Sequence, residues 1–140
     1  MLMDNKAIIH HFYEEAWNNR RLDVVDELIS LSHALNDPIV SGSQTGPELY
    51  KLRVVELTTS FPDLRFTIED IIAEKGKVVV SWIISGTHQS EFMDIPATGS
   101  KIFLEGITIH HVANGKILDS HARWDALDLL RQLGEVCALG

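Results

Sequence analysis

The sequence has a single cysteine, Cys137, so no disulfide can form within the chain. A chain of 140 residues is nevertheless long enough to bury roughly two-thirds of its unfolded surface, so its core needs no covalent or metal staple. The absence of disulfides fits a reducing compartment. We interpret Cys137 itself as an inert residue near the C-terminus.

Clusters of positive charge are also missing. The formal net charge is −8, and the only basic run is Arg20-Arg21. Binding to nucleic acid or to a membrane surface needs clustered cations, so we expect neither. The most apolar run, Val78 to Ile84, is broken by Ser81 and is too short to span a bilayer. The start of the chain lacks the basic and apolar regions of a signal peptide, so we expect a cytoplasmic protein.

The sequence contains no recognisable cofactor or metal motif. A phosphate-cradling loop, a dinucleotide fingerprint and a Ser-His-Asp arrangement are all absent. His110 and His111 would point to opposite faces of a strand, and His10 and His11 diverge around a helix. Neither pair supplies the convergent ligands that zinc requires. We therefore predict neither a cofactor nor a metal ion.

What is present begins with helical periodicity. Apolar residues recur at helical spacing over 8–17 and again over 22–29, which predicts two helices. The segment 31–46 is rich in turn residues and is predicted to be irregular. A third helix is predicted to begin at Pro47, where the missing N–H would be unpaired in any case, and to end at Phe61.

Beyond the third helix the pattern changes to the alternation of strands. Four strands are predicted, over 64–73, 77–88, 101–112 and 116–124. Lys75-Gly76 and Asn114-Gly115 mark hairpin turns between them, and a short final helix is predicted over 126–133.

This order of elements predicts a single α+β domain over residues 1–140. Long strands twist, so about three N-terminal helices are expected to pack in the concavity of a strongly curved, mainly antiparallel sheet. A pocket for a small hydrophobic or aromatic molecule would form between the concave face and the first helix.

Several motifs together resemble one known family. They are Gly86-Thr87-His88, Ile95-Pro96-Ala97-Thr98-Gly99, the segment 107–112 followed by Asn114-Gly115-Lys116-Ile117, and Trp124-Asp125 with Arg131-Gln132-Leu133-Gly134. This set is similar to the SnoaL-like polyketide cyclases, an ester-cyclase-like family within the nuclear transport factor 2-like superfamily of cone-shaped proteins. The resemblance covers the whole chain and implies that the curved sheet and its helices form a cone-shaped α+β barrel.

The resemblance also implies a chemistry, namely ring closure by an intramolecular aldol step. That step uses an aspartate on the last strand and a histidine on the strand before it. In this sequence the two positions are Ala122 and Thr108. An alanine has no group to transfer a proton, and a threonine hydroxyl is too weak an acid or base. The family's chemistry is therefore not carried over to this chain.

A more distant similarity is to ketosteroid isomerases, which share the cone fold. Their tyrosine on the first helix and their Asp-Pro base align with Tyr13 and with Asp37-Pro38. Such an isomerase combines a carboxylate base with hydrogen-bond donors for the developing enolate. Its protonated acid falls on Thr108, which is a weaker donor.

Three residues are candidate catalytic groups. Asp37 could serve as a general base, or it could form an Asx turn before Pro38. Tyr13 could stabilise an enolate oxygen, or it could be a core aromatic. His110 could act as an acid, base or donor, or it could be a buried histidine bonded to a neighbour. Both interpretations stay open for each residue.

Other residues are candidates for contact with a substrate. Side chains alternate along a strand, so Thr108 shares a face with His110. Ser120, Ala122 and Trp124 likewise share one face of the last strand, which the resemblance makes the pocket side.

Two further tryptophans, Trp17 and Trp82, could line a flat ligand or pack in the core. His111, His121 and Arg123 should point outwards. In the superfamily that outer face of the sheet often pairs subunits, so the resemblance implies a homodimer.

Two functions therefore remain. The first is a cofactor-independent isomerase, cyclase or dehydratase that acts by proton transfer on a ketone or aromatic metabolite. The second is a non-catalytic protein of the same fold, either a small-molecule binder or a dimeric scaffold. The sequence assigns no role to His88 and names no substrate.

Overall fold

The structure, a computed structural model, describes residues 4–40 and 44–134. The helices and strands of this part of the chain are, in order, α1 Asn5–His11, η1 Phe12–Asn18, α2 Leu22–Leu28, β1 Ile29–Asn36, β2 Gln44–Thr45, α3 Pro47–Ser60, β3 Arg65–Glu74, β4 Lys77–Thr87, β5 Lys101–Ala113, β6 Lys116–Trp124 and α4 Ala126–Gln132. Cys137 and the turn residues Ser41-Gly42-Ser43 lie outside the described residues.

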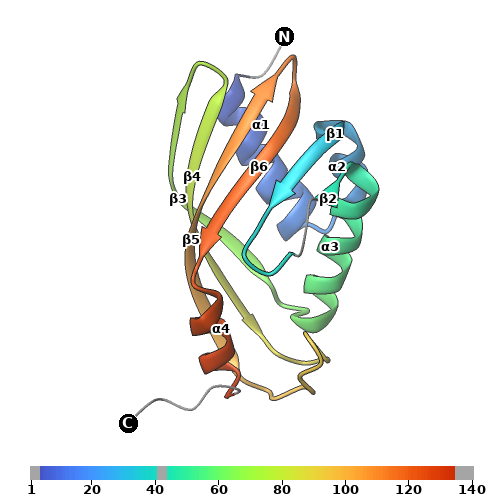
Figure 1. The fold of residues 1–140 in the computed structure, drawn as a ribbon, viewed down its shortest axis with the longest axis vertical. Helices are drawn as coiled ribbons and strands as arrows, with labels where there is room; N and C mark the ends of the chain where they lie inside the picture. The colour runs from blue at the N-terminus through green and yellow to red at the C-terminus, as the bar shows by residue number, and fades with distance from the viewer. Residues whose placement is uncertain (1–3, 41–43, 135–140) are drawn as a thin grey trace.

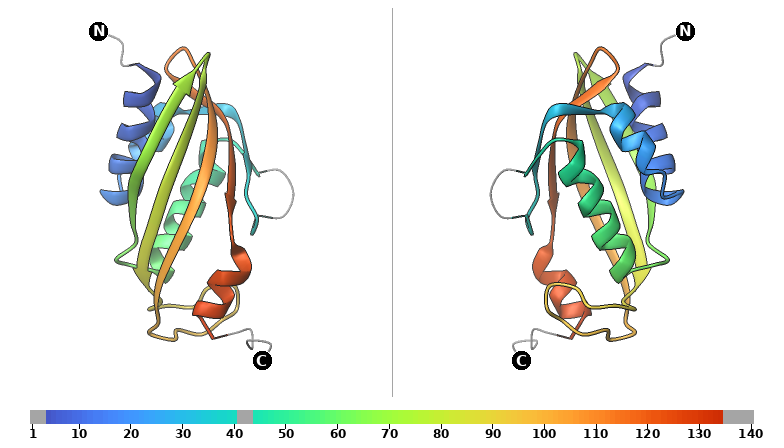
Figure 2. Two further views of the ribbon diagram at one scale, coloured as in Figure 1. Left: turned by 90° about the vertical axis from the view of Figure 1, so that its left-hand side faces the viewer. Right: turned by 90° about the vertical axis from the view of Figure 1, so that its right-hand side faces the viewer.

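The strands form one sheet in the order β2-β1-β6-β5-β4-β3. β1 runs parallel to β6, and the other neighbouring pairs are antiparallel. The sheet curves around α1, η1 and α3 (Figures 1 and 2), and it stays open, with β2 and β3 at its edges. The predicted α+β fold with a curved, mainly antiparallel sheet is confirmed, although the sheet does not close into a complete barrel.

The first helical region turns its apolar side toward the sheet. α1 begins after Asp4, whose side chain accepts a hydrogen bond from the Ala7 N–H at 2.8 Å. It continues directly into η1, a wider π-helix in which residues four apart lie close to one another along the helix. Tyr13 and Trp17 are such a pair, and both are buried. No helix in the described part of the chain is long and apolar enough to cross a membrane.

The prediction that 31–46 is irregular was wrong, because the segment contains most of β1 and all of β2. The buried positions of β1 are Ile29, His33 and Leu35, whereas Leu31 is 87% exposed. These positions mix polar with apolar side chains, and the partner strand β6 comes from the other end of the sequence. No local alternation therefore indicates the strand, and the prediction of four strands missed two.

The two hairpins have the predicted turns. Lys75-Gly76 and Asn114-Gly115 adopt positive φ at both residues, 49° and 78° in the first turn and 52° and 75° in the second. This is the backbone of the tight turns that match the twist of two-residue hairpins. As a result, the register of β3 with β4 and that of β5 with β6 follow from two short sequence signals.

Gly106 in β5 lets the concave face hold a large side chain. Trp82 stands opposite it on β4, and a Cβ at position 106 would lie 2.3 Å from the indole ring. No larger residue fits there without moving the ring. Trp82 Nε1 also donates a hydrogen bond to Thr108 Oγ1 at 2.9 Å, so the indole is held at both ends.

Candidate functional site

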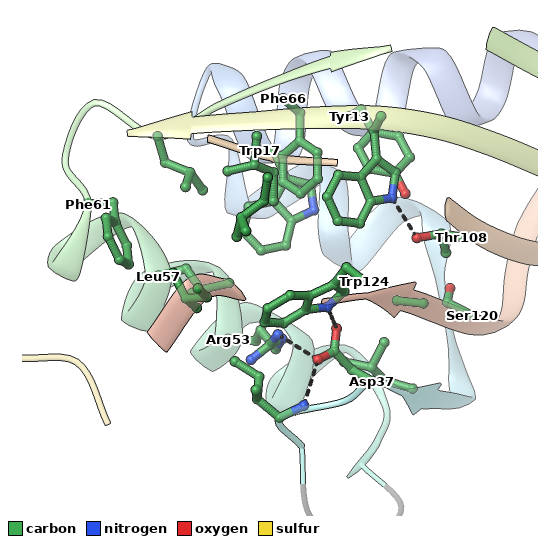
Figure 3. Close-up of a pocket in the computed structure, with 18 of the residues that line it drawn as sticks. Tyr13, Trp17, Asp37, Arg53, Leu57, Phe61, Phe66, Thr108, Ser120 and Trp124 are labelled. Carbon is green, nitrogen blue, oxygen red and sulfur yellow. Dashed lines mark hydrogen bonds and ion pairs between the residues drawn. The ribbon is translucent and has the colours of Figure 1, made fainter. Parts of the chain in front are cut away.

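A pocket lies between the concave face of the sheet, η1 and α3 (Figure 3). The atom-free space in it is about 730 Å³, including the part open to solvent. The residues that we predicted to be catalytic or to touch a substrate all lie in its wall: Tyr13, Trp17, Asp37, Trp82, Thr108, His110, Ser120, Ala122 and Trp124. The structure thus brings these residues together, and their roles remain predictions.

One end of the pocket carries four buried polar side chains that are joined by hydrogen bonds into a chain. The Tyr13 hydroxyl is 2.9 Å from Nε2 of His110. The other ring nitrogen of His110, Nδ1, is 2.7 Å from Ser120 Oγ, and that oxygen is 2.9 Å from Nε2 of His33. Each of the four residues is at most 4% exposed. The chain links η1 to β5, β6 and β1.

Burial keeps these groups uncharged. It lowers the pKa of His110 to about 3, with nearby His33 adding to the effect, and it lowers the pKa of His33 to about 4. Burial, followed by the influence of Tyr50, raises the pKa of the Tyr13 hydroxyl well above its ordinary value. At neutral pH this hydrogen-bonded chain therefore consists of two neutral imidazoles and two hydroxyl groups.

The hydrogen bonds between these four side chains can run in either of two directions, because Ser120 has one hydroxyl hydrogen and two imidazole neighbours. If Ser120 donates to His33, His110 donates from Nδ1 and accepts the Tyr13 hydrogen at Nε2. If Ser120 donates to His110, the Nε2–H of His110 donates to the Tyr13 oxygen. In that second arrangement the Tyr13 hydrogen is free to bond to a ligand in the pocket.

Thr108 and Ala122, the positions that correspond to the cyclase histidine and aspartate in the resemblance, lie directly opposite each other on β5 and β6. Both are buried in the pocket wall. The hydroxyl of Thr108 accepts the hydrogen bond from Trp82 described above. This part of the wall carries no ionisable side chain from either position.

The carboxylate of the pocket comes instead from Asp37, which follows β1 and lies across the pocket from Tyr13 (Figure 3). Its Oδ1 is 3.2 Å from the guanidinium of Arg53 and accepts a bond from the Ile39 N–H at 3.1 Å. Its Oδ2 accepts a bond from Trp124 Nε1 at 3.2 Å. The Ile39 contact is the Asx turn considered above, so the turn and a position in the pocket wall occur together.

Three polar residues around this site were not predicted from the sequence. Arg53 pairs with Asp37, Tyr50 accepts a hydrogen bond from Trp17 Nε1 at 3.0 Å, and His33 ends the buried chain. Arg53 and Tyr50 are three apart on α3, the spacing of neighbours on one helix face. The sequence gives no clear signal for Arg53, because Leu49 and Leu52 on the same helix are exposed and do not mark its inward face.

His88 has a structural position. It is fully buried against Phe61, with ring centroids 5.4 Å apart, and its Nδ1 is 2.9 Å from the Thr98 hydroxyl. Its backbone also bonds to Ser100 and Gly99. These contacts fasten the loop between β4 and β5, and Nε2 has no partner among the described residues.

The fold and the pocket define a class of protein, the cone-shaped α+β fold in which a curved sheet and helices enclose a pocket. The chain belongs to the SnoaL-like polyketide cyclase family, whose family model matches residues 7–133. Nogalonic acid methyl ester cyclase from Streptomyces nogalater is 30% identical over 122 residues, which is 86% of this chain and 90% of that protein. Aklanonic acid methyl ester cyclase DnrD from Streptomyces peucetius is 32% identical over 124 residues, covering 86% and 85%.

Solved structures show the same fold. TsrD from Streptomyces laurentii matches with a TM-score of 0.83 at 23% sequence identity, covering 96% of this chain and 100% of that one. A SnoaL-like polyketide cyclase from Agrobacterium tumefaciens strain C58 matches with a TM-score of 0.77 at 23% identity, covering 94% and 100%. The family membership that the sequence motifs predicted is confirmed.

Proposed function

We propose that the protein is a cofactor-independent enzyme that moves a proton next to the carbonyl group of a small ketone or aromatic metabolite. An isomerase, a cyclase or a dehydratase fits this description. The observation that carries the proposal is one pocket with a carboxylate, Asp37, in its wall and a buried hydroxyl, Tyr13, across from it. The names of the relatives, which are cyclases of nogalonic acid methyl ester and aklanonic acid methyl ester, support a carbonyl compound as the substrate class.

In the proposed reaction Asp37 takes a proton from the carbon next to the carbonyl. A carboxylate offers about four lone-pair directions, and the three donors on Asp37 leave one of them free. The electron pair of the broken C–H bond moves to the carbonyl oxygen, which becomes an enolate. Returning the proton from Asp37 to another carbon gives an isomer. Alternatively, the enolate carbon attacks a second carbonyl and closes a ring, and the alkoxide that forms takes the proton back from Asp37.

Tyr13 is the proposed donor to the enolate oxygen. Its raised pKa keeps the hydroxyl protonated, and a donor in a dry site stabilises developing negative charge most effectively. His110 supports this role as a donor to Tyr13 rather than as a base, because its low pKa makes the imidazole a poor proton acceptor.

A second function, non-catalytic binding, is supported by the resemblance together with the pocket wall. The two positions to which the resemblance assigns the acid–base groups of the cyclases are Thr108 and Ala122, and both line the pocket. In that case Asp37 and Arg53 form a structural ion pair, and the pocket holds its ligand without converting it.

The two functions are separated by a proton-exchange experiment. Ketones and aromatic metabolites are screened by thermal shift, and each hit is incubated with the protein in deuterium oxide. The proposal predicts deuterium next to the carbonyl, or a new product, detected by mass spectrometry. Ala122→Phe, which fills the pocket, should abolish both the thermal shift and the exchange. A hit that stabilises the wild type but gains no deuterium and yields no product would establish binding alone.

We also propose a homodimer through the outer face of the sheet. Phe103, Ile107 and Ile109 on β5 are 55%, 48% and 38% exposed there. Apolar side chains with charged neighbours of both signs, here Glu105 and Arg123, suit a surface that pairs with its own copy.

Ile107→Glu is therefore expected to shift the protein from dimer to monomer in sedimentation velocity at micromolar concentration. Burying the new carboxylate at the centre of the interface would weaken association by at least about tenfold. Leu52→Glu, which alters an exposed leucine of α3, is the matched control and should leave the dimer intact. A wild type that sediments as a monomer would contradict the proposal.

A further inference from the structure

Three metal-ligating side chains meet on the outer face of the sheet, away from the pocket. They are His111 on β5 and Asp119 and His121 on β6. Asp119 stands opposite His111 in the strand register, and His121 is two residues further along β6 on the same face. The ligand atoms of all three lie within 4.8 Å of one another. The sequence alone did not indicate this cluster, because its three residues come from two strands and meet only when the strands pair.

We infer that His111, Asp119 and His121 form a binding site for zinc or a similar divalent transition metal. Two imidazoles and one carboxylate are a ligand set that such ions accept, and a fourth position would be taken by water. The inference does not depend on the proposed reaction, because none of the three residues lines the pocket.

The distances suit a tetrahedral ion with little rearrangement. With metal–ligand bonds of about 2.0 Å, neighbouring ligand atoms in a tetrahedron are about 3.3 Å apart. Nε2 of His121 is 3.3 Å from Oδ1 of Asp119, and Nδ1 of His111 is 2.5 Å from the same oxygen. The ion would replace these two contacts, of which the His111 contact has to lengthen, and the ligand nitrogens of the two histidines already lie within 4.8 Å of each other. In the single chain all three side chains are partly exposed, at 38%, 32% and 45%, so the rings can adjust and an ion can reach them. His111 follows Ile107 and Ile109 on the same face of β5, so in the proposed dimer the ion would bind next to the interface.

The surrounding charges are compatible with a bound cation. Lys77 on β4 pairs with His111 in the strand register and is a positive charge near the site, but its side chain is exposed, so solvent screens it. Arg123, the next outward residue on β6, is bonded to the side chain of Asn36 at 2.7 Å. Asp119 supplies the one negative charge of the site.

The test is isothermal titration of tag-free protein with zinc chloride at neutral pH, in a Cys137→Ser background so that the thiol does not contribute. We expect one equivalent of zinc to bind with a Kd on the order of 10 μM. His121→Gln and Asp119→Asn should each weaken binding by at least about tenfold, since each removes one of three ligands. Both variants change partly exposed side chains, and circular dichroism checks their folding.

A double variant of α1, His10→Gln with His11→Gln, is the matched control because it removes two histidines of another element that are not part of the cluster. It should bind zinc as tightly as the parent protein. Three results would overturn the inference: no saturable binding by the parent, equal binding by His121→Gln, or loss of binding in the α1 control. Any of them would mean that the three side chains form only a hydrogen-bonded cluster.

Discussion

Lowering the pH from 7 to 5 is expected to reduce the free energy of unfolding by on the order of 3 kcal/mol. The cause is the pair of buried imidazoles, His33 and His110, whose pKa values of about 4 and about 3 lie below the ordinary value of 6.5. In the unfolded chain both imidazoles take up protons once the pH falls below about 6.5. In the folded protein both imidazoles stay neutral until the pH approaches their lower pKa values. Protonation below pH 6.5 therefore stabilises the unfolded state relative to the folded state.

The sign follows from the proton balance. Below pH 6.5 the unfolded state binds more protons than the folded state, so stability falls as the pH falls. The contribution is fully present above the unfolded pKa and is lost progressively toward the folded pKa values. The slope is at most about 1.4 kcal/mol per pH unit for each histidine. Most carboxylates stay ionised in both states above pH 5, so this window isolates the histidines.

Urea unfolding at several pH values measures this slope. The double variant His33→Gln with His110→Gln removes both titrating groups and should flatten the profile, whatever its stability at pH 7. His10→Gln, which alters an exposed histidine of α1, should leave the slope of the wild type unchanged. A wild-type free energy of unfolding that stays constant between pH 7 and 5 would show that the imidazoles titrate normally.

Asp37→Asn is expected to lower the turnover of a converted substrate by about 10²–10⁴-fold, the usual contribution of a general base. Asparagine keeps the shape of the side chain and can still accept the bond from Trp124, but its amide oxygen cannot take up the substrate proton. The thermal shift produced by the substrate should change much less than the rate. The measurement is kcat together with the rate of deuterium incorporation.

The control for charge is Asp26→Asn, which removes an exposed carboxylate that pairs with Lys51 on α3. It should leave kcat unchanged. A second variant, Asp37→Asn with Arg53→Met, removes the guanidinium that the single variant leaves without its partner. If both Asp37 variants convert the substrate as fast as the wild type, Asp37 is not the base.

Much of the pocket wall could be predicted because strand alternation is a local property. Asn114-Gly115 fixes the hairpin between β5 and β6, and from that turn the pleat decides which side chains face inwards. Thr108, His110 and Ala122 were placed on the pocket side by this alternation together with the resemblance. The helix residue Tyr13 was placed by resemblance alone.

The missed residues depend on contacts between distant segments. His33 lies on β1, which is a strand only because β6 and β2 supply its hydrogen-bond partners. On α3, the leucines Leu49 and Leu52 are 38% and 64% exposed, so hydrophobicity gives no guide to the face that carries Arg53. Tertiary packing determines which face of this helix points inwards, and the sequence pattern alone does not indicate that face.

The indoles of the pocket have one more consequence. The chain has three tryptophans, and all of them, Trp17, Trp82 and Trp124, stand in the wall of the same hollow. The intrinsic tryptophan fluorescence of the folded protein therefore comes entirely from side chains in the wall of this pocket. A ligand that enters the pocket changes the polarity around all three tryptophans at once, so the fluorescence of the unlabelled protein reports whether the pocket is occupied.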